Sequence, residues 1–173
     1  MYKGQIEMVD KLKKFFAENE EKMQLSMKKI LNESLNNNDI RALFFECENV
    51  YSDFDIMFYA IDNVKKIFLR KKDIMDEINN KHLFLKSLAE EENEIDAKYE
   101  DKSSKYEDFC YDYYETKKEI VKNRVILCWD NIKGEYNDIP DTFFLFENDY
   151  AINLNTKKEL TNNERMKLMK SMR

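Results

Sequence analysis

Apolar residues recur every seven positions between residues 83 and 129, interrupted in the repeat only by Glu92. The repeat consists of Leu85, Tyr99, Tyr106, Tyr113, Ile120 and Leu127. Apolar positions spaced three and four apart form one stripe of a helix, and a sustained seven-residue spacing is typical of coiled coils. The pattern predicts one long helix, about 75 Å if continuous. Ser103-Ser104 is the expected break point, because serine competes as a helix cap.

Helical spacing predicts two more long segments in the first half of the chain. Residues 5–35 carry a narrow apolar stripe, and residues 40–78 carry a broader one rich in aromatic side chains. The broad stripe predicts a central helix that contacts several neighbours. Asparagine and aspartate cluster at residues 36–39, and two asparagines stand at residues 79–80, so we predict turns there.

The pattern changes after Gly134. Residues 142–146 and 150–154 are rich in aromatic and aliphatic side chains and flank a polar turn, which predicts a short β-hairpin. A lone hairpin is marginal in water, so it must pack on the helices or add to another sheet. Thr161 followed by Glu164 is a capping-box pattern, which predicts the start of a terminal helix.

Composition supports a helical fold. The 173 residues include two glycines and one proline, and neither type occurs between Gly4 and Gly134. Loops and hairpins usually need these residues. We predict a mostly α-helical fold, an elongated coiled-coil-like bundle of three long helical segments over residues 1–136. The small C-terminal hairpin and terminal helix of residues 137–173 should pack on this bundle as part of a single domain.

Negative charge is concentrated in the middle of the predicted long helix. Residues 89–115 contain eleven acids and three lysines, a net charge of −8, whereas the whole chain carries −6. Residues 157–173 carry six basic residues and two acids. A local acidic field steers a basic partner towards it. The alternative that this run is only the solvated face of a helix stays open.

Tyrosines are interleaved with the acids of this band. The tetrapeptide Lys-Tyr-Glu-Asp occurs at residues 98–101 and again at residues 105–108, one seven-residue repeat apart. Tyr111 and Tyr114 lie off the apolar stripe, and exposed tyrosine is typical of protein interfaces. The predicted partner-binding face consists of Glu91, Glu94, Tyr99, Glu100, Asp101, Tyr106, Glu107, Asp108, Tyr111, Asp112, Tyr114 and Glu115.

The hairpin phenylalanines are a further candidate contact surface. Phe144 and Phe146 are two positions apart and share a face, while Phe143 points to the opposite face. An aromatic side chain on an open face marks a contact surface or an exposed edge. We therefore include all three as candidate hairpin contacts.

Residues typical of catalytic and metal sites are scarce. His82 is the single histidine and has no nucleophile motif nearby, so a catalytic triad, a multi-histidine zinc site and a di-iron bundle are not expected. Two distant glycines cannot form a phosphate-binding loop. A magnesium site at Asp53, Asp55 and Asp62 stays open by residue type, although Asp53 and Asp55 face different sides of a helix. We predict no catalytic residue, no metal, no cofactor and no enzymatic activity.

The chain shows no sign of membrane targeting. It has no run of about 18–20 apolar residues, no apolar signal region at its N-terminus and no glycine at position 2. Cys47, Cys110 and Cys128 are too widely spaced for a disulfide framework or a metal site, so we expect reduced, buried thiols. We predict a soluble, cytoplasmic protein that does not contact a membrane.

These patterns favour a non-enzymatic inhibitor or adaptor that binds a protein partner with a basic surface. Carboxylates spaced along a rod imitate phosphates by charge, so the nucleic-acid site of a defence or nucleic-acid-processing enzyme is one such surface. Small viral inhibitors of host defence nucleases provide an analogy of mechanism. A virus-encoded protein acting in the host cell fits that analogy.

Two other functions stay open. A self-assembling coiled-coil scaffold would form a homo-oligomer through the seam between Tyr99 and Tyr113. Direct nucleic-acid binding would use the basic terminal helix and a basic cluster, but the net charge of −6 disfavours it. The basic cluster consists of Lys65, Lys66, Arg70, Lys71 and Lys72.

Overall fold

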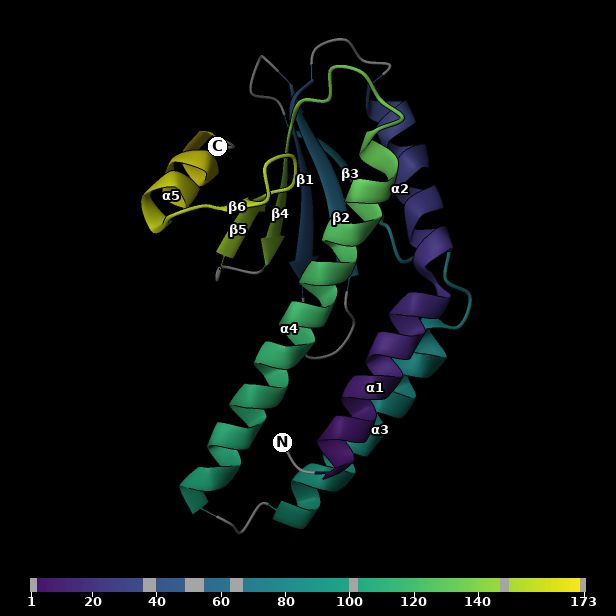
Figure 1. Ribbon diagram of the computed structural model, residues 1–173, viewed down its shortest axis with the longest axis vertical. Coiled ribbons are helices and arrows are strands. Elements are labelled where there is room, and N and C mark those ends of the chain that lie inside the picture. Colours follow the sequence, from purple (N-terminus) through teal and green to yellow (C-terminus); the bar gives the residue numbers. More distant parts are fainter. Residues whose placement is uncertain are drawn as a thin grey trace.

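The molecule is a layered α/β structure in which helices cover a mixed six-stranded sheet (Figure 1). The computed structural model describes residues 3–35, 40–48, 55–62, 67–99, 103–146 and 150–171. In chain order its elements are α1 (Lys3–Glu18), α2 (Glu20–Leu35), β1 (Ile40–Glu48), β2 (Asp55–Asp62), β3 (Ile67–Asp73), α3 (Lys81–Tyr99), α4 (Ser103–Lys133), β4 (Asp141–Phe146), β5 (Tyr150–Asn153), β6 (Lys158–Glu159) and α5 (Asn162–Ser171).

The predicted helix over residues 40–78 is wrong, because this region forms strands β1, β2 and β3. Strand β1 is buried on both faces: Phe45 packs beneath the helices, and Phe44 packs in a second cluster on the opposite face. Such a strand appears in sequence as a continuous apolar run. In a run of this kind, apolar residues also occur three and four positions apart, so periodicity alone does not distinguish a strand from a helix. The aromatic and β-branched content of the run favours strand over helix.

The sheet has the strand order β3-β2-β1-β4-β5-β6. Strands β1 and β4 are parallel, with Phe44 opposite Phe143, whereas the other neighbouring strands pair antiparallel. A parallel pair needs a long crossover connection, and α3 and α4 supply part of it between β3 and β4. The predicted three-helix bundle with a small separate hairpin is therefore wrong. Strands β4 and β5 do pair antiparallel, but β4 also joins β1 in one large sheet.

The predicted long helix is divided into α3 and α4, which run in opposite directions (Figure 1). Helix α4 begins at Ser103, within the serine pair expected to break the helix. Helices α1 and α3 and the N-terminal half of α4 extend beyond one end of the sheet. We call this group of helices the helical arm.

The coiled-coil prediction is also wrong. A straight helix drifts by about 20° per heptad from a seven-residue stripe. Helix α4 follows that drift: it buries Val121, Val125 and Trp129, whereas Leu127, a member of the repeat, is 42% exposed. The apolar stripe of α4 therefore covers a sheet and does not pair with one long partner helix.

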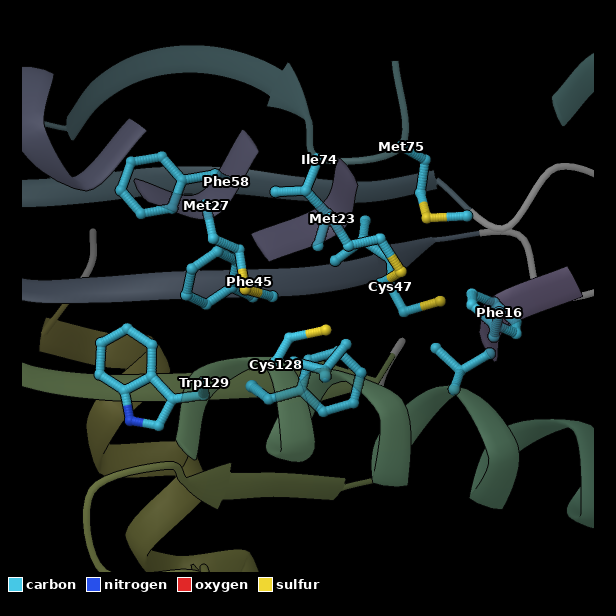
Figure 2. Close-up of a cluster of buried hydrophobic side chains, with 14 of the residues drawn as sticks. Phe16, Met23, Met27, Phe45, Cys47, Phe58, Ile74, Met75, Cys128 and Trp129 are labelled. Atoms are coloured by element: carbon cyan, nitrogen blue, oxygen red, sulfur yellow. The ribbon is translucent and has the colours of Figure 1, made fainter. Parts of the chain in front are cut away.

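The main core lies between the sheet and the helices on one of its faces, as Figure 2 shows. Trp129 of α4 approaches Phe45 of β1 with ring centroids 6.1 Å apart, and Met23 and Met27 of α2 close the same cluster. The opposite face of the sheet carries a smaller cluster, against which Leu168 of α5 packs. The two halves of the predicted division at residue 136 thus share a sheet and a core.

Helix α5 begins with the capping box expected from Thr161 and Glu164. The Glu164 carboxylate accepts hydrogen bonds from the Thr161 N–H (2.8 Å) and hydroxyl (2.9 Å), and the Glu164 N–H donates to the Thr161 hydroxyl at 3.3 Å. These bonds, with one from Lys158, lower the pKa of Glu164 to about 2. The carboxylate therefore stays charged and caps α5 throughout the neutral range.

Candidate functional site

A buried ion pair lies between helices α3 and α4 of the helical arm. One oxygen of Glu92, Oε1, accepts hydrogen bonds from the Tyr113 hydroxyl at 2.8 Å and from the Lys117 ammonium at 2.7 Å. The side chain of Lys117 is only 4% exposed, and that of Glu92 is 21% exposed. The ammonium also lies 5.1 Å from the centroid of the Tyr113 ring, a cation–π distance. Since burying a lone charge is costly, the pair couples α3 to α4.

Local sequence explains how these groups meet. Tyr113 and Lys117 are four residues apart, so they occupy one face of α4. Glu92 occupies a position of the seven-residue apolar repeat, which turns its carboxylate inwards. In sequence, Glu92 stands out as a polar interruption of the repeat, whereas no local pattern marks Lys117. A lone acid inside an apolar stripe was the available signal that a buried cation faces it.

A cavity of about 180 Å³ adjoins this ion pair. It lies between α1, α3 and α4 and is lined by Gln5, Met8, Glu92, Ile95, Cys110, Tyr113, Tyr114 and Lys117. Gly4 allows α1 to approach α3 closely here, because a Cβ atom at Gly4 would lie 2.8 Å from Cδ1 of Ile95. The cavity combines aromatic, aliphatic and sulfur-containing walls with one charged pair, a composition typical of small-molecule sites.

Part of the predicted acidic face is neutralised by lysines from outside the band. Glu91 pairs with Lys11 of α1 at 2.6 Å, and Glu115 pairs with Lys118 at 2.5 Å. The Lys118 ammonium also lies 4.7 Å from the centroid of the Tyr114 ring. These predicted face residues therefore form contacts within the protein, which leaves less of the acidic band available to a partner.

Other members of the predicted face are exposed. Tyr111 is 65% exposed, Asp112 next to it is exposed, and Glu94 of α3 is exposed. In the described part of the chain, the carboxylates of Asp112 and Glu94 have no ion-pair partner. Glu100 and Asp101 lie outside the described residues, and so do the side chains of Tyr99, Tyr106, Glu107 and Asp108.

The hairpin phenylalanines are all buried. Phe144 and Phe146 belong to the main core and are 0% exposed. Phe143 faces the other side of the sheet, where its ring stacks on Phe44 with centroids 5.4 Å apart. The structure thus uses these three residues as packing on the two sides of β4.

The structure describes the candidate basic and magnesium sites only in part, and Asp53 lies outside the described residues. Lys65 and Lys66 lie outside the described residues, and residues 70–72 belong to strand β3 instead of a helix end. Asp55 pairs with Lys81 at 2.6 Å, and Asp62 lies at the other end of β2. Among the residues that the structure describes, no three His, Cys, Asp or Glu side chains are grouped to hold a metal ion.

The three thiols differ in accessibility, and we expect one of them to react in the native protein. Cys47 and Cys128 are fully buried, and burial with the nearby Glu20 carboxylate raises the pKa of Cys128 to about 12. Because the thiolate is the reactive form, Cys128 should be inert below about pH 10. Cys110 is half-buried at the cavity. A disulfide reagent at pH 8 should titrate one thiol in the native protein and three in denaturant.

Peptide mapping and Cys110→Ser provide the control for this expectation. The substitution should remove the fast-reacting thiol and leave the two slow ones. Labelling of Cys47 or Cys128 before Cys110 would contradict the burial described above.

The fold and site define an α/β protein with a helical arm that contains a cavity beside a buried ion pair. No family model, curated protein or solved structure matches this chain. Among the described helices, none has the length and apolar character needed to span a bilayer.

Proposed function

We propose that this chain is a non-enzymatic inhibitor or adaptor whose helical arm binds a basic surface of a protein partner. The observation that supports this most is the exposure of Tyr111 beside Asp112 on α4, whose carboxylate has no ion-pair partner among the described residues. A tyrosine offers a large rigid contact area, and an adjacent carboxylate adds electrostatic steering. Neither side chain belongs to the apolar core clusters. Core packing therefore does not account for these two residues, and both are accessible to a partner.

The proposed binding surface is narrower than the acidic band. Glu91, Glu92 and Glu115 pair with lysines outside the band, which offsets part of its charge. Of the predicted partner-binding face, Glu94, Tyr111 and Asp112 are the exposed members in the described part of the chain. The nucleic-acid site of a defence or processing enzyme stays part of the proposal as one basic surface of this kind, as do cytoplasmic action and a viral origin.

Charge reversal at the arm tests the proposal. We expect Glu94→Lys together with Asp112→Lys to weaken partner binding at least about tenfold at low salt, because each reversal replaces attraction by repulsion. Affinity should be measured by biolayer interferometry against a partner captured from nuclease-treated lysate at low salt and released at high salt. Circular dichroism should show unchanged helix content.

A variant of equal net charge provides the matched control. Asp76→Lys together with Glu77→Lys reverses two exposed acids in the turn between β3 and α3. This control should retain the affinity of the native chain within about twofold, since neither acid belongs to the proposed binding surface and salt screens the long-range part of its charge. Equal losses in the two variants would show a general charge effect, and no loss in either would overturn the proposed surface.

A further inference from the structure

The cavity of the helical arm has the dimensions of a single-ring ligand. Its volume is about 180 Å³. An apolar protein cavity of about 150 Å³ accommodates benzene. The cavity therefore has space for one six-membered ring with one small substituent.

The walls suit a flat aromatic ring. Met8 contributes a thioether, Tyr113 and Tyr114 contribute aromatic rings, and Ile95 contributes an aliphatic surface. Aromatic rings pack favourably on other rings and on methionine sulfur, beyond the contribution of their buried area. These four side chains come from three helices, so a bound ring would contact every helix of the arm.

The polar end of the cavity favours a neutral hydrogen-bond donor. Both donors that reach Glu92, the Tyr113 hydroxyl and the Lys117 ammonium, bond to Oε1. The other oxygen, Oε2, accepts no hydrogen bond from the described residues. Lys117 already balances the charge of Glu92. A charged ligand would therefore bring an extra charge into a largely apolar site, whereas a hydroxyl or amine donor would satisfy Oε2 without one.

We propose that this cavity binds a neutral, single-ring aromatic molecule that carries one hydrogen-bond donor, with simple phenols as the representative class. The ring contacts Met8, Ile95 and the two tyrosines, and its donor bonds to Oε2 of Glu92. This binding site is separate from the exposed surface proposed for the protein partner and does not depend on it.

Methyl NMR on the full chain tests the proposal. The protein is labelled at methionine and isoleucine methyl groups and titrated separately with p-cresol, toluene and benzoate. We expect p-cresol to shift the Met8 and Ile95 resonances saturably, with a dissociation constant of about 1 mM or below for a ligand of this size. Toluene lacks the donor and should bind about tenfold more weakly, which is the loss of one hydrogen bond to a charged group. Benzoate should bind more weakly than p-cresol because its charge is not compensated.

Two cavity-filling variants and one neighbouring control complete the test. Cys110→Phe should fill the cavity and abolish the saturable shift of the Met8 resonance. If the Cys110→Phe protein does not fold, Ile95→Phe is used as the cavity-filling variant instead. Leu127→Ala changes a side chain on the same helix that is 42% exposed and does not line the cavity, so this variant should bind p-cresol as the native chain does. The proposal is overturned by unsaturable shifts spread over surface methyl groups, or by unchanged binding in a folded filled variant. Equal affinities for toluene and p-cresol would overturn the role of Glu92.

Discussion

Replacing Trp129 with alanine should lower the free energy of unfolding by about 3–5 kcal/mol. The indole is fully buried where α4 packs on the sheet, and it contacts Phe45 of the central strand β1. Alanine removes most of this contact and leaves a cavity that the surrounding strands and helices cannot collapse to fill. For a chain of this length, such a loss should lower the melting temperature by about 6–20 °C.

Two substitutions separate packing from other effects in this experiment. Leu127→Ala changes the same helix at a side chain that is 42% exposed, so it should cost less than about 1 kcal/mol. Trp129→Phe keeps an aromatic ring and removes the indole N–H, which has no hydrogen-bond partner among the described residues. It should cost less than Trp129→Ala. Urea and thermal unfolding followed by circular dichroism measure all three, and similar losses at Trp129 and Leu127 would contradict the packing described here.

The fold could be predicted from sequence only where the segments are amphipathic and well separated by polar turns. The helical character of residues 5–35 was predicted, although Asn19 divides it into α1 and α2. The side-chain amide of Asn19 donates to the Phe15 carbonyl at 2.9 Å and shares that acceptor with the Asn19 backbone N–H at 3.2 Å, a local side-chain bond where α1 gives way to α2. The strand identity of residues 40–48 and 55–62 could not be obtained from spacing alone. Burial on both faces removes the polar half of the β alternation, and helical spacing then fits equally well.

Prediction of the candidate site from sequence was limited by contacts between residues far apart in the chain. The acidic band is visible in sequence, but one lysine that neutralises part of it, Lys11, lies 80 residues before its partner Glu91. Long-range pairing of this kind depends on how α1 and α3 pack and has no local signature. The Glu92–Lys117 pair could be predicted in part, because the inward position of Glu92 follows from the seven-residue repeat. Only the identity of its partner required the structure.

Replacing Glu92 with leucine should destabilise the protein by about 3 kcal/mol. The substitution removes the carboxylate 2.7 Å from the Lys117 ammonium, whose side chain is 4% exposed. The buried positive charge then loses a compensating partner, and the Tyr113 hydroxyl loses its acceptor at 2.8 Å. If Lys117 is also replaced by methionine, the charge disappears and an apolar side chain of similar length fills the space. The double variant should therefore regain at least half of the lost stability.

A double-mutant cycle on the Glu91–Lys11 ion pair tests whether the effect predicted for Glu92 and Lys117 depends on their burial. Glu91 and Lys11 are separated by 2.6 Å, nearly the same distance, but their side chains are 35% and 52% exposed. Water and salt screen that pair, so its coupling energy should be below about 1 kcal/mol and should fall with added salt. The coupling energy of Glu92 and Lys117, measured by urea unfolding of all four variants, should be about 2 kcal/mol and depend little on salt. Equal coupling in the two cycles would show that the pair beside the cavity is solvated, which would also weaken the electrostatic reason for expecting a neutral ligand there.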